Sequence, residues 1–217
     1  MCKVLRYAAK VTAHRTPEPA DRVRDAERTK RCLLEAALDE FAAHGYAGAR
    51  VSEIAARARV NKQLITYYFG GKAGLYTALQ RYWQERERDI DDPGLPLADV
   101  VLRYLEHVLH DPRGLRLLMW RGLSDAETPS GITPITETDL AEARTRQRRG
   151  EIAADLDPAA YQLAILGMVA APVLLPAQVR TLFGIDPQTP EFERHYGEQL
   201  RRIISRLAES NEQGVQI

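Results

Sequence analysis

The chain has 217 residues, of which 45% are hydrophobic and 28% are charged, a composition typical of a soluble globular protein. Residues 1–15 contain several charges and lack the continuous apolar segment of a secretory signal. The longest apolar run, Leu163 to Leu175, is shorter than the roughly 20 residues that span a bilayer. We therefore exclude a secreted or membrane-spanning protein and expect a cytoplasmic one.

The formal net charge of zero hides an uneven distribution. Up to Ile90 there are 17 Lys and Arg against 11 Asp and Glu, whereas the remainder has 13 against 19. The front half therefore has a net charge of +6 and the back half of −6. This asymmetry predicts that the two halves meet different partners, and a polyanion such as nucleic acid suits the first.

The first predicted element is a helix that begins near Asp25, after an extension at residues 1–23 that we expect to be flexible. Apolar residues recur at three- and four-residue spacing, and Gly45 follows where a helix commonly ends. This stripe consists of Leu33, Leu34, Ala37, Leu38 and Phe41. A short second helix is predicted at residues 51–58, where Val51, Ile54, Ala55 and Ala58 share a face.

The next segment, Val60 to Lys72, contains the run LITYYF, which favours a β-strand by residue preference alone. No other alternating run is present to pair with such a strand, and an isolated strand is not stable. On a helix, Val60, Leu64 or Ile65, and Tyr68 or Phe69 would form an inward face, and four polar or aromatic residues would point outward: Lys62, Gln63, Thr66 and Tyr67. We therefore predict a third helix and a helix-turn-helix whose second helix enters a DNA major groove.

The segment Leu33 to Tyr76 resembles the tetracycline-repressor (TetR/AcrR) family of bacterial transcription regulators. The order of its motifs matches: Gly45-Tyr46, then Val51-x-x-Ile54-Ala55, then Val60-Asn61-Lys62, then Tyr67-Tyr68-Phe69-x-x-Lys72. The resemblance implies an all-α fold of about nine helices. It implies a three-helix DNA-binding domain at residues 24–71, a larger ligand-binding and dimerisation domain at 72–210 and a tail at 211–217.

The resemblance also implies which residues contact DNA. Lys62, Gln63, Thr66 and Tyr67 match positions that face base edges, and Tyr68 and Lys72 match positions that contact phosphate. Lys donates to guanine, Gln pairs with adenine, and a Thr methyl contacts thymine. The full set of expected DNA-binding residues is Arg50, Ser52, Asn61, Lys62, Gln63, Thr66, Tyr67, Tyr68 and Lys72.

Three residues depart from the family pattern. Arg50 stands where a Ser or Thr helix cap is usual, so we expect no side-chain cap, although Arg50 can reach phosphate. Arg59 replaces a Gly of the turn, where a positive φ strains other residues. Thr66 replaces a longer Tyr. Taken alone, aromatic residues at helical spacing are usually core, and Lys62 would then be an ordinary solvated residue. We adopt the core interpretation for Val60, Ile65 and Phe69.

Longer helices are predicted after Lys72. The fourth helix runs toward Ile90, a fifth follows Pro96, a sixth covers residues 113–123 and a seventh covers residues 135–152. An eighth opens at Asp157-Pro158, and the last begins after Pro190. In the resembled family the last two helices form the homodimer interface, and here the expected interface residues are Gly167, Ala171, Phe192, Tyr196, Leu200, Ile203 and Leu207.

The middle helices are expected to enclose a cavity for a small effector, as the resemblance implies. Large or amphipathic side chains are the candidates to line it: Trp83, Tyr104, His107, Met119, Trp120, Tyr161 and Met168. His107 and His110 share a helix face, but two histidines without a clear third ligand are usually not a metal site, so we expect no metal and no cofactor.

These patterns predict a ligand-responsive, DNA-binding repressor that binds a palindromic operator as a homodimer. No phosphate-binding loop, zinc-protease or nucleophile-elbow motif is present, so we expect no enzyme. The alternatives are a helical protein-interaction module and an uncharacterised all-α enzyme.

Overall fold

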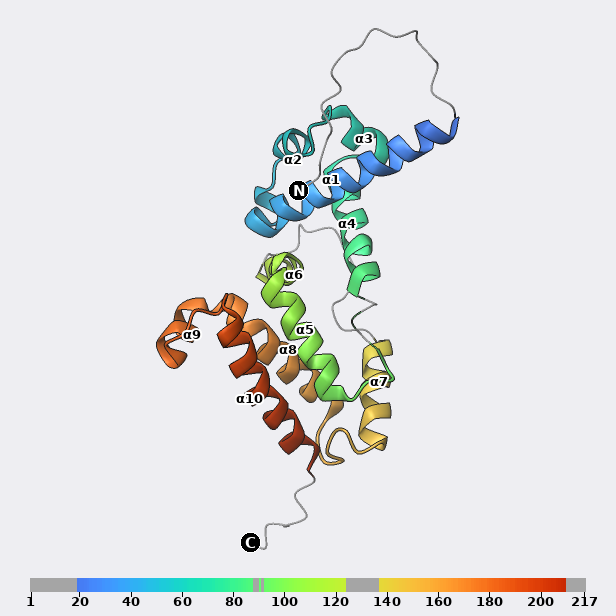
Figure 1. Cartoon of the computed structure of the whole chain (residues 1–217). Helices are drawn as coiled ribbons and strands as arrows, with labels where there is room; N and C mark the ends of the chain where they lie inside the picture. Colours follow the sequence, from blue (N-terminus) through green and yellow to red (C-terminus); the bar gives the residue numbers. More distant parts are fainter. Residues whose placement is uncertain (1–18, 88–89, 91, 124–136, 210–217) are drawn as a thin grey trace, which may run out of the picture. The chain divides into compact units, whose positions relative to one another are not determined.

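The computed structural model describes residues 19–87, 90, 92–123 and 137–209. Within these residues it contains ten α-helices and no strand, which confirms the predicted all-α class (Figure 1). The helices are α1 (Pro19–Gly48), α2 (Val51–Ala58), α3 (Gln63–Phe69), α4 (Lys72–Glu87), α5 (Leu97–His110), α6 (Arg113–Leu123), α7 (Glu137–Arg148), α8 (Pro158–Leu174), α9 (Pro176–Phe183) and α10 (Pro190–Ala208).

Apart from the end of α7, which lies at Arg148 and not at residue 152, the helices differ from the prediction in three details. First, α1 begins at Pro19, before the expected start at Asp25, because polar residues continue the helix ahead of the apolar stripe. Second, α3 begins only at Gln63, so Val60, which the prediction placed on this helix, lies before its start. Third, the eight-residue α9 was not predicted, because the apolar run ending in Leu175 reads as one helix while the chain bends there by 89°. Among the described helices none is by itself long and apolar enough to cross a membrane.

The chain divides into two compact units. Unit 1 contains residues 1–82 and 120–131, and unit 2 contains residues 83–119 and 132–217. The divisions fall inside α4, between Tyr82 and Trp83, and inside α6, between Met119 and Trp120. The predicted tail at residues 211–217 lies outside the described residues, and the predicted domain limits stay a prediction.

The core of unit 1 is built on the apolar stripe of α1. Leu33, Ala37, Leu38 and Phe41 are fully buried, as their helical spacing predicted. The Phe41 ring packs edge to face against Tyr76 of α4, with 5.0 Å between the ring centroids. These contacts fix α1 against α4, and α2 packs against α1 as well.

Gly45 ends the regular part of α1, as predicted. Its φ of 66° and ψ of 179° bend the helix, which then continues to Gly48. The indole of Trp120 lies over this bend, and its Nε1–H donates to the Ala42 carbonyl oxygen at 3.1 Å. A Cβ at position 45 would lie 3.1 Å from the indole ring, so both the backbone angle and the contact require glycine.

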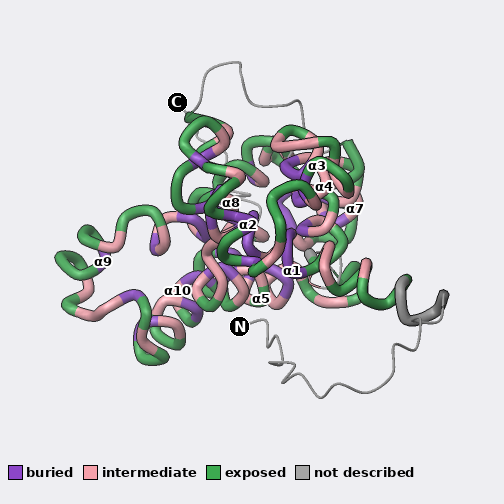
Figure 2. Tube along the Cα trace, turned by 90° about the horizontal axis from the view of Figure 1, so that it is seen from above, coloured by how far each residue is buried: buried purple, intermediate pink, exposed green. Residues whose placement is uncertain are grey.

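Unit 2 is a helical bundle in which α5 packs against α8 and α10, and α8 also packs against α7. The predicted starts of α8 and α10 are confirmed by their caps. The Asp157 carboxylate accepts hydrogen bonds from the backbone N–H groups of Ala159 and Ala160, and the Thr189 hydroxyl accepts one from Phe192. In the tube of Figure 2, α9 is mostly exposed.

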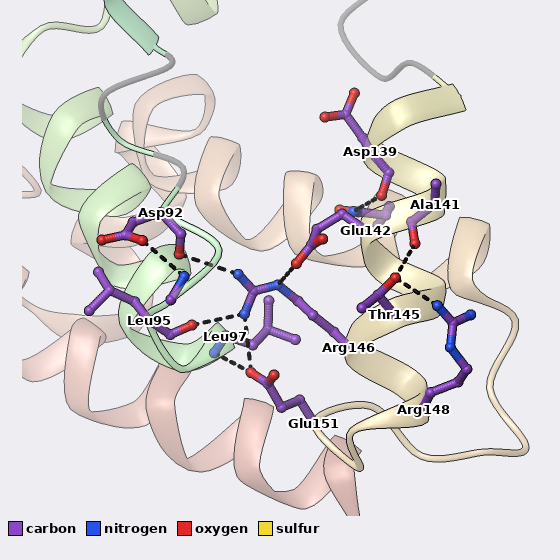
Figure 3. A network of polar contacts seen from close by, with 12 residues as sticks. Asp92, Leu95, Leu97, Asp139, Ala141, Glu142, Thr145, Arg146, Arg148 and Glu151 are labelled. Atoms are coloured by element: carbon purple, nitrogen blue, oxygen red, sulfur yellow. Dashed lines mark hydrogen bonds and ion pairs between the residues drawn. The ribbon is translucent and has the colours of Figure 1, made fainter.

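A buried arginine connects α7 to the segment that precedes α5 (Figure 3). Arg146 is only 3% exposed and forms ion pairs of 3.1 Å with both Glu142 and Glu151. Its guanidinium also donates to the Leu95 carbonyl at 3.0 Å, while Glu151 accepts from the Leu97 backbone N–H at 2.7 Å. One cation therefore satisfies two carboxylates and positions the start of α5.

Replacement of Arg146 by Met should lower the free energy of unfolding of the chain by about 3–5 kcal/mol, because it leaves two partly buried carboxylates without their cation. Urea denaturation followed by circular dichroism measures this change. Arg148→Ala is the matched control on the same helix, because Arg148 is exposed and should contribute less than about 0.5 kcal/mol. A loss below about 1 kcal/mol for Arg146→Met would show that the network is dispensable.

Candidate nucleic-acid interface

The turn between α2 and α3 has the geometry of a helix-turn-helix. Arg59 ends α2 in the left-handed conformation, with φ 58° and ψ 42°, so this non-glycine residue adopts the positive φ that the sequence predicted to be strained. The Asn61 side chain then accepts a hydrogen bond from the Gln63 backbone N–H at 2.8 Å and starts α3. Asn61 therefore has a structural role in the turn.

The third helix presents the predicted outward face. Ile65 is fully buried and anchors α3 on unit 1, and Val60 and Phe69 are half-buried. The side chain of Tyr67 is 79% exposed, although large aromatic side chains are rarely left in water. Among the expected base-facing and flanking residues, the exposed ones are Arg50, Ser52, Asn61, Lys62, Gln63, Thr66 and Tyr67. The start and outer face of α3 thus expose four different groups: the Lys62 ammonium, the Gln63 amide, the Thr66 methyl group and the Tyr67 ring.

The start of α2 has no side-chain cap at Arg50, as predicted. A carboxylate from α1 compensates for the missing cap. Glu40 is buried, and its Oε1 accepts a hydrogen bond from the Arg50 backbone N–H at 3.1 Å. The other carboxylate oxygen lies 3.9 Å from Arg57 Nη2. The sequence did not reveal this role, because Glu40 and Arg50 are on different helices and match no local capping motif.

Lysines from α1 and α4 flank α3. Lys72 Nζ donates to the Ala47 carbonyl oxygen at 3.2 Å and lies 4.8 Å from the centroid of the Tyr46 ring. Partial burial lowers the pKa of Lys72, and the nearby Glu40 opposes this shift. Lys30, which was not predicted, lies 5.6 Å from the centroid of the half-buried Tyr68 ring. Only the packing of α1 against α3 reveals Lys30, because it lies far from α3 in the sequence.

The expected effector-lining residues divide between the units. Trp120 belongs to unit 1, where it packs over Gly45. Within unit 2, Trp83 lies 5.4 Å from His107 between ring centroids, and Tyr104, Met119, Tyr161 and Met168 pack in the apolar core. The structure therefore brings six of the seven candidates into one unit.

Two of the expected effector-lining residues contain a buried polar atom that lacks a hydrogen-bond partner. Among the described residues, His107 Nε2 and the Tyr161 hydroxyl are buried without a hydrogen-bond partner. Burial lowers the pKa of His107, whereas it raises the pKa of Tyr161 to about 12. Both side chains are consequently neutral near pH 7 and can donate or accept hydrogen bonds.

An open groove of about 580 Å³ lies between α5 and α10 of unit 2. Charged residues from both helices line it, including Arg103, Glu106, Glu193 and Arg194. None of the seven expected effector-lining residues is among its lining residues. This groove is therefore separate from the apolar interior of the bundle.

The expected dimer interface needs a correction. Phe192 and Leu200 have no exposed surface, so they cannot contact a second chain, and the prediction was wrong for both. Their i, i+8 spacing on α10 reflects the core of unit 2. Gly167 and Ile203 are exposed, whereas the other expected interface residues, Ala171, Tyr196 and Leu207, are half-buried. The Tyr196 hydroxyl donates to the Met168 carbonyl at 2.8 Å within the chain.

Known proteins are similar to this chain in both sequence and fold. Residues 33–79 match the family described as bacterial regulatory proteins of the tetR family, and residues 96–206 match the tetracyclin repressor-like C-terminal domain. The HTH-type transcriptional repressor SCO4008 of Streptomyces coelicolor is 35% identical over 190 residues, which are 84% of this chain and 98% of that protein. The HTH-type transcriptional regulator RutR of Escherichia coli K12 is 42% identical over 60 residues, 28% of each chain.

Solved structures of other proteins have the same fold as this chain. SCO4942 from Streptomyces coelicolor has a TM-score of 0.63 and 25% identity, covering 81% of this chain and 97% of that chain. AibR, solved in complex with isovaleryl coenzyme A and operator DNA, has a TM-score of 0.60 and 20% identity over the same shares, a likeness that shows the fold. The resemblance seen in residues 33–76 is confirmed, and the chain belongs to the tetR family of bacterial regulatory proteins, as a DNA-binding transcriptional regulator.

Proposed function

We propose that this protein is a cytoplasmic repressor, not an enzyme, that binds a palindromic operator as a homodimer and leaves it when a small effector binds. The observation that supports this most is the exposed face of α3, held by the buried Ile65 and presenting Lys62, Gln63, Thr66 and Tyr67. The relative SCO4008 is a transcriptional repressor, which supports repression and not activation by this protein.

The residues of this face suit different base pairs. Lys62 donates to guanine O6 or N7, Gln63 pairs with the N6 and N7 atoms of adenine, and the Thr66 methyl contacts the thymine methyl. Lys72 and Lys30 flank the helix with charge that suits the phosphate backbone. Base specificity therefore resides on α3, and general affinity resides in the lysines beside it.

Gln63→Ala should change the preferred base at one operator position by about 1–3 kcal/mol, because it removes a bidentate contact. Lys72→Met keeps the apolar stem over Tyr46 but removes the charge, so it should weaken binding to all sequences alike and lower the salt slope by about one. Binding isotherms on a set of single-base operator variants, at several salt concentrations, separate the two effects. If Lys72→Met shifted base preference and left the salt slope unchanged, its assignment to phosphate would be incorrect.

Exposed apolar residues of α8 and α10 support the homodimer. Leu163 is 66% exposed on α8, and Gly167 and Leu174 are exposed at i+4 and i+11 from it, on one side of the helix. Ile203 of α10 is 43% exposed. We infer that this face, Leu163, Gly167, Leu174 and Ile203, replaces the buried Phe192 and Leu200 as the contact with a second chain. A two-fold dimer would place two α3 helices in successive major grooves, about 34 Å apart.

Ile203→Glu should convert the dimer to a monomer at micromolar concentration and abolish tight operator binding, because it would bury a charge in an apolar interface. Sedimentation velocity measures the oligomeric state. Leu182→Glu is the matched control, since Leu182 is exposed on α9 outside the proposed face and its replacement should leave the dimer intact. A wild-type chain that sediments as a monomer with operator affinity retained would rule out the dimer.

The apolar interior of unit 2 supports an effector that is largely apolar with a polar group. Met119 and Met168 are adaptable side chains, and His107 and Tyr161 supply buried polar atoms that a ligand can satisfy. Release requires that the effector prefer the state that does not bind DNA. A hundredfold loss of operator affinity corresponds to a preference of about 2.7 kcal/mol.

An effector that releases DNA must itself bind more weakly when operator is present, by the same factor. Calorimetric titration of any compound that releases the operator, with and without saturating DNA, should show this reciprocity. Tyr161→Phe should weaken such a compound without changing the operator affinity of the free protein. Equal affinities in both titrations would refute allosteric release by that compound.

A further inference from the structure

We propose that Glu106 and His110 of α5 and Glu193 of α10 form a binding site for a divalent transition-metal ion, with Zn²⁺ as the preferred ion. One ligand atom from each of the three side chains lies within 4.8 Å of the others. His110 Nε2 is 4.0 Å from Glu193 Oε2. All three residues belong to unit 2, whereas the helix-turn-helix belongs to unit 1.

The helices bring these residues together for simple geometric reasons. Glu106 and His110 are four residues apart, so their side chains lie on one face of α5. Glu193 lies in the first turn of α10, which packs against α5. The sequence pointed to His107 as the partner of His110, but the His107 ring packs beside Trp83 and its Nε2 is buried. The third ligand comes instead from a helix distant in sequence, which spacing along the chain does not reveal.

The orientation of the His110 ring favours a metal at Nε2. Nδ1 lies 2.8 Å from the Glu106 carbonyl oxygen, so Nδ1–H donates to that carbonyl, and the lone pair of Nε2 is directed away from it. Metal-binding histidines commonly hold their second ring nitrogen in this way, which fixes the tautomer and the plane of the ring.

The ligand set selects the ion. One imidazole nitrogen and two carboxylate oxygens suit Zn²⁺, whereas Mg²⁺ and Ca²⁺ prefer oxygen ligands alone. Glu106 and Glu193 also line the open groove between α5 and α10, so water can complete the coordination. Arg103 and Arg194 line the same groove, and their charge makes the site weaker than a buried structural zinc site.

A metal ion at this position would join α5 to α10. The exposed carboxylate of Glu106 and the half-buried one of Glu193 would become ligands of one cation, and the two helices would be crosslinked near the start of α10. Because only the folded chain holds the three ligands together, binding should raise the midpoint of thermal unfolding as the zinc concentration rises.

The test uses the full-length chain without an affinity tag, treated with chelator and then titrated with ZnCl₂ by calorimetry and thermal unfolding. We expect one zinc ion per chain, a higher unfolding midpoint, and no effect of MgCl₂ at equal concentration. Glu193→Gln and His110→Gln should each weaken zinc binding about tenfold or more. Circular dichroism of both variants without zinc confirms that they fold.

Two control variants make the result specific. Glu198→Gln removes a carboxylate that lines the same groove, and His195→Gln removes an exposed imidazole of the same helix. Both should bind zinc as the wild type does. The proposal is overturned if the wild type shows no zinc binding at about 100 µM, if Glu193→Gln and His110→Gln bind as the wild type, or if His195→Gln loses binding equally. Should His110→Gln fail to fold, Glu106→Gln gives the same discrimination.

Discussion

The DNA-reading unit depends on one buried carboxylate. Glu40 of α1 accepts a hydrogen bond from the backbone N–H of Arg50, which precedes α2, and lies 3.9 Å from Arg57 of α2. Its charge also opposes the lowering of the Lys72 pKa that burial causes at the start of α4. A buried carboxyl group is costly unless hydrogen-bond donors and cations surround it, so the positions of the three helices are tied to the partners of Glu40. The position of α2, and with it the turn that leads into α3, therefore depends on a residue that is buried in unit 1.

Sequence periodicity predicted much of the fold because the helices of unit 1 are amphipathic. The α1 stripe from Leu33 to Phe41, the stop at Gly45 and the outward face of α3 all follow from helical spacing. Periodicity identifies a buried face but not what covers it, which is why the stripe on α10 was assigned to a partner chain although Phe192 and Leu200 pack inside unit 2.

Contacts between residues distant in sequence were the part that could not be predicted. The cap supplied by Glu40, the position of Trp120 over Gly45 and the proximity of Glu193 to His110 each join helices whose relative placement no local pattern encodes. Arg146 is similar, because an arginine among the charges of α7 reads as a solvated residue until its burial is known. Local rules describe single helices well, whereas polar contacts between helices require the folded chain.

Helices α4 and α6 each contribute residues to both units, so helical backbone joins the units there. The same division separates the two tryptophans of the chain. Trp83 is buried in unit 2 beside the ring of His107, whereas Trp120 is partly exposed in unit 1, with its indole N–H bonded to Ala42. The protein consequently contains one tryptophan fluorophore in each unit. Emission from a chain that retains only Trp120 reports on unit 1, which contains the helix-turn-helix, and emission from one that retains only Trp83 reports on the bundle of unit 2.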